Sequence, residues 1–437
     1  MKDFFMKTKT FSVYIIYFSI FYLLSFSAEA KKILILYSTG GHSTAAKAIS
    51  QMIRSDDPTA EIISYDFKLQ GTKFGYAFYD HGYDLLSRHA SWINSFGMNL
   101  LWIKGELIDA SNNSNFLIPT ENLKNYIKSI SPDIIINTHF ISAAILAELR
   151  KQGEFLDIPI AWTHLDHVDN NYYRSLGHQL DMTFLPTDKM AQNWEKVIDK
   201  SKLAASGIPI LPSMIQPVNK NLRHSILEKI GFDPENKTIL LLGGSMGALS
   251  FQKIIENIMR KSFSGKLLQV IAVCGRNEIL RSQLESWASK FPDTALKLYT
   301  TGFIPLDETR NLQTAADIII SKPGGLTSFE LLSSQTPVIF TESIGSQETR
   351  NANFMKSENA ALFLPNINDI GDAVGNLLSN SELNSNLIQN QNLIRISLFN
   401  FDKILEWIHN PLTHFSSEKS FLKHRLCQKI LSKDFKK

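Results

Sequence analysis

The chain of 437 residues contains little cysteine and almost no net charge. Its two cysteines, Cys274 and Cys427, offer neither a disulfide framework nor zinc-ligand spacing. A net charge of +3 is too small to indicate nucleic acid, so no such partner is expected. Neither H-E-x-x-H nor Asp-x-Asp occurs, and no metal is expected. Three histidines and an aspartate follow expected strands without metal-ligand spacing: His139, His164, Asp166 and His167.

The rest of the composition is that of a globular protein, with 44% apolar and 20% charged residues, and the length suggests two domains. Residues 1–30 stand apart, because a basic start, the apolar stretch Phe11–Phe26 and an A-x-A pattern ending at Ala30 follow one another. This order is typical of a secretory signal peptide, although an uncleaved membrane anchor is the alternative. We therefore expect either a membrane-associated protein, peripheral or anchored by this leader, or an exported one.

One stretch in the C-terminal third has the features of a nucleotide site. An apolar run ending at Ile320 is followed by Ser321–Gly325 and then by a helix-compatible segment from Leu326. A junction of strand, glycine turn and helix start leaves backbone N–H groups unpaired, and a phosphate binds well there. Glu330 lies about one turn further into the helix, where its carboxylate can accept hydrogen bonds from a ribose. Phosphate and ribose together indicate a nucleotide.

The same strand–glycine–helix pattern occurs twice more. Gly243–Ala248 follows the apolar strand 238–242 and leads into a helix, and Gly40–Ser43 follows the strand 33–37. His42 lies at the end of its strand, where parallel sheets bind ligands, and its intrinsic pKa suits a general base. A capping or packing histidine is the alternative.

Strands alternate with helices throughout, which predicts two α/β domains with parallel sheets. We place the first at residues 31–212 and the second at 213–397. The tail, 398–437, carries apolar residues at helical spacing among lysines and arginines. A basic amphipathic helix is typical of a membrane surface, and packing on the first domain is the alternative.

Aromatic residues are concentrated in Phe67–Trp102, which includes Tyr76 and Trp92. Tyrosine and tryptophan favour the interface between membrane and water, so this segment suggests contact with lipid. Helical core packing is the plainer interpretation of the same residues.

Three motifs, Gly243–Ala248, Lys322–Glu330 and Gln347–Ala352, together resemble the donor half of the GT-B glycosyltransferases. The resemblance is strongest to the branch that holds the monogalactosyldiacylglycerol synthases, the processive diacylglycerol glucosyltransferases and the lipid II N-acetylglucosaminyltransferase. Gly40–Ser43 and Ser206–Pro209 resemble acceptor-domain motifs of the diacylglycerol enzymes. A GT-B fold, with two Rossmann-like α/β domains facing each other across a cleft, is implied.

The resemblance also implies an inverting transfer of a hexose from a UDP-sugar to diacylglycerol or another lipid acceptor at a membrane surface, giving galactosyl- or glucosyl-diacylglycerol. No cofactor or metal is expected, because helix N-termini can neutralise a leaving diphosphate. A UDP-sugar epimerase on the same fold and a non-catalytic nucleotide- or lipid-binding relative are the alternatives.

By this resemblance His42 acts at the acceptor hydroxyl, as its base or its positioner, and Glu330 binds the ribose. Phe303 flanks the nucleotide base or simply packs. Gln347 and Glu348 contact the donor sugar. The diphosphate is expected on two loops, formed by Gly243, Gly244, Ser245 and Gly247 and by Gly324, Gly325, Leu326 and Thr327. The acceptor is expected at Gly40, Gly41, Tyr76 and Trp92.

Overall fold

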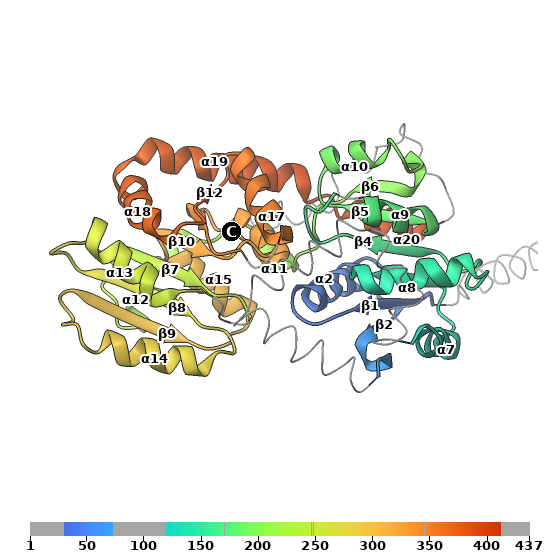
Figure 1. Ribbon diagram of the computed structural model, residues 1–437, viewed down its shortest axis with the longest axis horizontal. Coiled ribbons are helices and arrows are strands. Elements are labelled where there is room, and N and C mark those ends of the chain that lie inside the picture. Colours follow the sequence, from blue (N-terminus) through green and yellow to red (C-terminus); the bar gives the residue numbers. More distant parts are fainter. Residues whose placement is uncertain are drawn as a thin grey trace, which may run out of the picture.

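The computed structural model describes residues 30–72, 119–169, 171–245, 247, 249–343 and 346–411. Within these ranges the chain forms two sheets of six parallel strands, each flanked by helices, which lie side by side (Figure 1). The predicted pair of Rossmann-like α/β domains is therefore confirmed.

The first sheet has the order β2-β1-β3-β4-β5-β6. Its strands are β1 (Lys32–Tyr37), β2 (Glu61–Asp66), β3 (Ile134–Asn137), β4 (Ile160–Thr163), β5 (Met182–Leu185) and β6 (Leu203–Ala205). Its helices are α2 (Gly41–Asp56), α7 (Thr120–Ile130), α8 (Phe140–Lys151), α9 (Asn171–Gln179) and α10 (Asp188–Trp194). Because helices cover both faces, the central strands are continuous apolar runs such as Ile134–Asn137, which is buried throughout.

The second sheet has the order β12-β11-β10-β7-β8-β9. Its strands are β7 (Thr238–Leu242), β8 (Leu268–Val273), β9 (Leu296–Thr301), β10 (Ile318–Ser321), β11 (Val338–Phe340) and β12 (Leu362–Phe363). Its helices are α12 (Arg223–Lys229), α13 (Phe251–Ser262), α14 (Glu278–Ala288), α15 (Leu306–Ala315), α16 (Gly325–Glu330), α17 (Ser346–Ser357), α18 (Ile370–Ser379) and α19 (Ser381–Leu398). Short 3-10 helices are η1 (Phe67–Gln70), η3 (Lys200–Lys202), η4 (Lys220–Leu222), η5 (Leu331–Ser333) and η6 (Ile367–Asp369).

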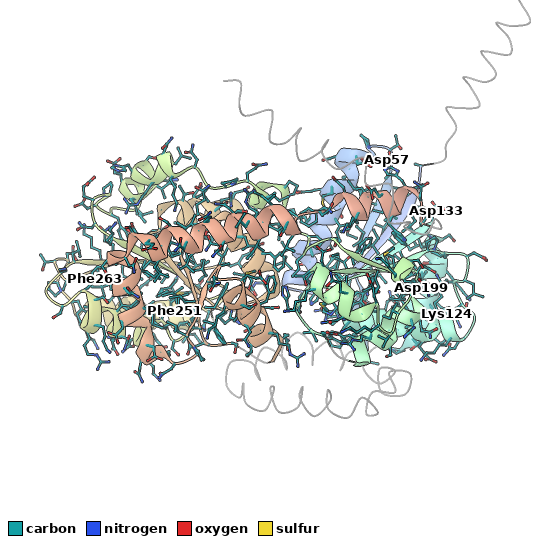
Figure 2. All side chains as sticks on the ribbon, turned by 90° about the horizontal axis from the view of Figure 1, so that it is seen from above. Asp57, Lys124, Asp133, Asp199, Phe251 and Phe263 are labelled. Atoms are coloured by element: carbon teal, nitrogen blue, oxygen red, sulfur yellow. The ribbon has the colours of Figure 1, made fainter. Side chains whose placement is uncertain are left out.

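The chain crosses between the domains twice. The first crossing passes through α11 (Pro212–Ile215), and the second runs from α19 into α20 (Asp402–His409), which packs beside α2 of the first domain (Figure 2). The Nζ atom of Lys403 donates to the carbonyl oxygen of Ala205 at 2.7 Å, and Lys31 Nζ donates to that of Ile408 at 2.9 Å. The second crossing therefore ties the C-terminal helix to the first sheet.

The two crossing segments touch backbone to backbone at Gly207. Its φ of +77° favours glycine, and a Cβ built there would lie only 1.9 Å from the carbonyl oxygen of Leu398. Any larger residue would push the two crossings apart, which explains the glycine in the Ser206–Pro209 motif.

Phe67 is the one aromatic residue of the aromatic segment that lies within the described residues. Phe67 is 1% exposed and packs with the buried side chains of the first sheet, so the core-packing interpretation is confirmed for this residue. Tyr76 and Trp92, together with the leader up to residue 29 and the tail from residue 412, lie outside the described residues. Their expected contacts with lipid stay predictions.

Candidate active site

The acceptor-side and donor-side helix starts meet between the two domains. α2 begins at Gly41 and α16 begins at Gly325, each just after the carboxyl end of a parallel strand. A Cβ built on Gly41 would lie 3.4 Å from the Cδ1 atom of Leu326, which is buried in this contact. Gly40, with a φ of +71°, turns the chain from β1 into α2. Two junctions predicted separately from the sequence thus form one region.

His42 is held as a neutral imidazole. Its Nδ1 atom lies 2.6 Å from the carbonyl oxygen of Thr138. A carbonyl oxygen only accepts, so Nδ1 carries the hydrogen and Nε2 keeps a free lone pair. Burial lowers the pKa of His42 to about 4, against the opposing effect of the Thr138 hydrogen bond. At neutral pH the ring can therefore accept a proton at Nε2.

A second histidine supports this ring. His139 lies with its ring centroid 4.4 Å from that of His42, and its Nδ1 accepts a hydrogen bond from the Ile141 backbone at 3.1 Å. Burial holds the pKa of His139 well below its usual value, and the nearby His42 and Lys68 lower it further. His139 therefore caps the start of α8 and packs against His42. Capping or packing was the alternative role considered for His42 itself.

The loop before His42 rests on a buried lysine that the sequence analysis had not singled out. Lys68 is 2% exposed, and its Nζ atom lies 3.4 Å from the hydroxyl oxygen of Thr39 and 3.7 Å from a carboxylate oxygen of Asp66. Because these three residues come from the ends of β1 and β2, the ion pair steadies the turn that presents His42.

The loop after β7 is shaped by its glycines. Gly244 and Gly247 have φ values of +70° and +63°, and a Cβ on Gly247 would lie 2.0 Å from the carbonyl oxygen of Cys274. Gly243 is equally enclosed, with a Cβ position 2.8 Å from the ring of Phe251. Ser245 accepts a hydrogen bond from the Arg276 backbone at 2.9 Å, which ties this loop to the end of β8.

The predicted helix follows this loop after a short gap. α13 begins only at Phe251, and Glu342 binds its N-terminus: the Ser250 backbone N–H and hydroxyl donate to the carboxylate at 2.7 and 2.6 Å. The helix dipole that favours a phosphate at a helix N-terminus also favours a carboxylate there. Glu342 therefore already places one negatively charged group at the start of α13.

Lys322 places a cation beside that loop. It follows β10, its Cε atom lies 3.7 Å from a Cβ built on Gly244, and its Nζ lies 3.1 Å from a carboxylate oxygen of Glu348. The two side chains are only 12% and 15% exposed. The sequence signal for Lys322 was its position between strand and glycine turn. Glu348, which is expected at the donor sugar, pairs with this lysine, and its contact with a sugar stays a prediction.

Gln347, the other residue expected at the sugar, keeps an unsatisfied acceptor. It lies in the first turn of α17, and its Oε1 atom is buried without a hydrogen-bond partner in the described part of the chain. On α16, the hydroxyl oxygen of Thr327 lies 3.6 Å from a Cβ built on Gly324. The buried amide oxygen of Gln347 is thus available for a ligand, and the Thr327 hydroxyl lies beside the glycine turn.

Glu330 is a buried carboxyl group of α16, 7% exposed. Burial raises its pKa to about 7, although the charge of Arg310 works in the opposite direction. Burial likewise lowers the pKa of Arg310 to about 10, and its Nη1 and Nη2 atoms have no hydrogen-bond partner among the described residues. A buried carboxyl group beside an incompletely satisfied guanidinium suits a ligand that brings its own hydroxyl groups.

Phe303 is exposed rather than packed. Its side chain is 60% exposed after the end of β9, and the guanidinium carbon of Arg276 lies 5.1 Å from its ring centroid. The packing alternative for Phe303 is therefore wrong. Arg276 was not among the predicted site residues, and its only signal in the sequence is its place shortly after the end of β8.

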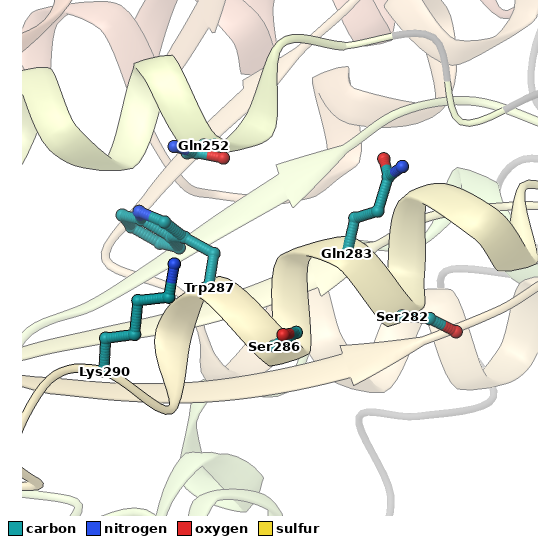
Figure 3. A pocket seen from close by; sticks show the side chains of 6 residues that line it. All are labelled: Gln252, Ser282, Gln283, Ser286, Trp287 and Lys290. Atoms are coloured by element: carbon teal, nitrogen blue, oxygen red, sulfur yellow. The ribbon is translucent and has the colours of Figure 1, made fainter.

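One surface groove is lined by none of the site residues described above. It measures about 510 Å³ and is formed by Gln252 of α13 and by one face of α14 (Figure 3).

Among the residues that the structure describes, no group of three or more His, Cys, Asp or Glu is arranged to hold a metal. None of the described helices is long and apolar enough to cross a membrane.

Family models and known proteins resemble both halves of the chain. The model for monogalactosyldiacylglycerol (MGDG) synthase matches residues 42–210, and that for the glycosyltransferase family 28 C-terminal domain matches residues 238–402. A processive diacylglycerol beta-glucosyltransferase of Bacillus licheniformis is 26% identical over 361 residues, 80% of this chain and 83% of the relative. One of Bacillus cereus is 30% identical over 244 residues, 55% of this chain and 58% of the relative.

Solved structures show the same fold. MurG of Acinetobacter baumannii has a TM-score of 0.52 at 15% identity, covering 87% of this chain and 99% of that one. A protein described as a UDP-N-acetylglucosamine 2-epimerase from Listeria monocytogenes reaches 0.58 at 13% identity, covering 88% and 98%.

The two α/β domains have the GT-B fold, and the family models that match them identify the chain as a glycosyltransferase. More narrowly, its two halves match the family models of monogalactosyldiacylglycerol synthase and of the glycosyltransferase family 28 C-terminal domain, and its relatives include processive diacylglycerol glucosyltransferases, as its motifs predicted.

Proposed function

We propose that this protein transfers a hexose from a UDP-sugar to diacylglycerol, with inversion at the anomeric carbon. The observation that carries the proposal is the contact of α2 with α16, which brings the helix turn that carries the neutral His42 to the start of the donor-side helix. The relatives named as diacylglycerol glucosyltransferases support the choice of acceptor.

In this mechanism His42 Nε2 accepts the proton of the lipid hydroxyl as its oxygen attacks the anomeric carbon. The bond between that carbon and the diphosphate breaks, and UDP departs with the bonding electrons. The imidazolium then returns its proton to solvent. Backbone N–H groups at Gly325 and Leu326, together with the Lys322 ammonium, stabilise the charge that develops on the leaving diphosphate.

The nucleoside lies against the second sheet. Glu330 accepts hydrogen bonds from the ribose, and the exposed ring of Phe303 stacks with the base, while Arg276 covers part of the same ring. The unsatisfied Oε1 of Gln347 accepts a hydroxyl of the sugar. These contacts use the exposed ring of Phe303, the unsatisfied amide oxygen of Gln347 and the buried carboxyl group of Glu330.

The reaction takes place at a membrane surface, because its acceptor is a lipid. Tyr76 and Trp92 are assigned to the acceptor side from their sequence alone, and the same holds for the leader and the basic tail as membrane contacts. No bound cofactor is required, since the UDP-sugar supplies both the sugar and the leaving group.

Mass spectrometry of lipids tests the proposal. The full-length protein is incubated with diacylglycerol vesicles and UDP-glucose, UDP-galactose or UDP-N-acetylglucosamine. A lipid heavier by one hexose, with one UDP released per sugar, is the expected product. Conversion of the nucleotide sugar without lipid would instead indicate the epimerase, whose support is limited to a similarity of fold. UDP binding without either reaction would indicate a non-catalytic relative.

A further inference from the structure

A buried asparagine of the second domain binds both domains at once. Asn351, on α17, is 1% exposed. Its Nδ2 donates to the Oδ1 atom of Asp166 at 2.9 Å and to the carbonyl oxygen of Pro323 at 3.2 Å, and its Oδ1 accepts from the His167 backbone at 2.9 Å. Asp166 and His167 follow β4 in the first domain, whereas Pro323 begins the donor-side glycine turn.

The same glycine turn presses directly on the first-domain loop. A Cβ built on Gly325 would lie 2.2 Å from the carbonyl oxygen of Leu165 and 2.8 Å from Asp166 Oδ1. No side chain fits in this contact. The glycine expected here for phosphate binding is thus also required where the two domains touch.

An aromatic contact completes the junction. The ring of His167 stacks on that of Phe354 with centroids 3.9 Å apart and planes 16° apart, and it lies 5.5 Å from the ring of Phe329. Both phenylalanines belong to the second domain. The loop Leu165–His167 is therefore fixed by hydrogen bonds on one side and by ring stacking on the other.

Asp166 depends on Asn351 because it is half-buried. Burial raises the pKa of Asp166, while the hydrogen bond from Asn351 lowers it. The other ionisable group in the loop, His167, has its pKa lowered by burial to about 4 and is therefore neutral at pH 7. Without the amide of Asn351, the carboxylate would lose the hydrogen bond that compensates its burial.

We propose that Asn351 is a positioning residue, which locks the loop Leu165–His167 onto the Pro323–Gly325 turn and so holds His42 facing the bound donor. The last step rests on the proposed function. The donor-binding groups all belong to the second domain, so loss of the lock leaves UDP binding intact. Turnover falls, because the acceptor side is no longer held against the donor.

The test uses the full-length protein with Asn351→Ala and, as a matched control, Asn353→Ala, an exposed asparagine of the same helix. Asn351→Ala is expected to lower kcat at least tenfold and to leave the Kd for UDP within threefold of wild type. The control should change neither value. Unchanged kcat in Asn351→Ala, or a loss of UDP affinity equal to the loss of kcat, would overturn the proposal.

A swapped pair separates positioning from simple damage. Asn351→Asp sets two carboxylates against each other, so its kcat should fall furthest. In the double variant with Asp166→Asn, the amide at position 166 can donate to the carboxylate at position 351, which still accepts from the His167 backbone. The kcat of the double variant should therefore be at least threefold higher than that of Asn351→Asp. Equal kcat for the single and the double variant would count against the lock.

Amide hydrogen exchange tests the lock without any activity. The backbone N–H of His167 donates to Asn351, so it should exchange at least tenfold faster in Asn351→Ala than in wild type or Asn353→Ala. If wild type transfers no sugar but shows this difference, the proposed function fails and the lock stands. Equal exchange in all three proteins would refute the lock.

Discussion

Two glycine junctions of similar sequence pattern differ in what their helices offer to a ligand. At Gly40–Ser43 the helix starts at once, and its first turn presents His42 between the domains. At Gly243–Gly247 the helix starts later, and its N-terminus is already bound by Glu342. A strand–glycine–helix pattern therefore predicts a tight turn reliably, but whether the helix end is free depends on residues far away in the chain.

The acceptor-side junction should show the largest effect. His42→Ala removes the only proton acceptor assigned to the reaction, so kcat should fall by roughly 10²–10⁴-fold while the donor KM stays near wild type. Steady-state kinetics at saturating lipid measure both values. His178→Ala, an exposed histidine of the first domain, is the control and should behave like wild type. A variant at His42 with normal turnover would assign the base elsewhere.

Glu330 tests the donor side through its pKa. The folded protein holds this proton up to about pH 7, whereas an unfolded glutamate loses it near 4.5. The stabilising contribution of the protonated carboxyl is therefore full below pH 4.5 and is lost as the pH rises through 7. The shift corresponds to roughly 3 kcal/mol. Glu330→Gln escapes this loss, so its Tm should exceed that of wild type by more at pH 8 than at pH 5.

UDP titrations at the same pH values complete the Glu330 experiment. If the ribose donates to the ionised carboxylate, wild type should bind UDP more tightly at pH 8 than at pH 6, and Glu330→Gln should bind it weakly at both. A pH-independent Tm difference would mean that the carboxyl is solvated, and equal UDP affinities would remove Glu330 from the ribose site.

Much of this arrangement could be predicted from local sequence. The strands are continuous apolar runs ending in glycine turns, so both sheets and the positions of His42 and Glu330 follow from neighbouring residues. The partner of each site residue could not be predicted in this way. Glu342 reaches Ser250 across 92 positions and Asn351 reaches Asp166 across 185, and no local pattern encodes such pairs.

Glu348 shows the same limit within one motif. Its place beside Gln347 predicted a sugar contact, but the fold brings Lys322 to 3.1 Å, and the ion pair takes up one of its carboxylate oxygens. The spacing of apolar residues along the sequence predicts that a residue lies on a helix. It does not predict which charged side chain, from the end of another strand, will pair with that residue.

Lys322 should contribute less than His42, because it stabilises charge without moving a proton. Lys322→Gln should weaken UDP binding about tenfold and uridine binding much less, since only UDP carries the diphosphate. Calorimetric titration with the two ligands measures the difference. Glu348→Gln is the paired control: it frees the lysine, so UDP affinity should hold or rise. Equal losses for uridine and UDP would place Lys322 away from the phosphates.

Glu342 should show the smallest effect and tests the comparison of the two junctions most directly. Glu342→Ala removes both hydrogen bonds to Ser250, so the second domain should lose about 1 kcal/mol or slightly more, or roughly 2–4 °C in Tm. The Kd for UDP should stay unchanged, because the loop Gly243–Gly247 rather than the α13 N-terminus faces the ligand. If UDP bound more tightly once the carboxylate was gone, the helix end would be a phosphate site that Glu342 blocks, and the two junctions would be alike after all.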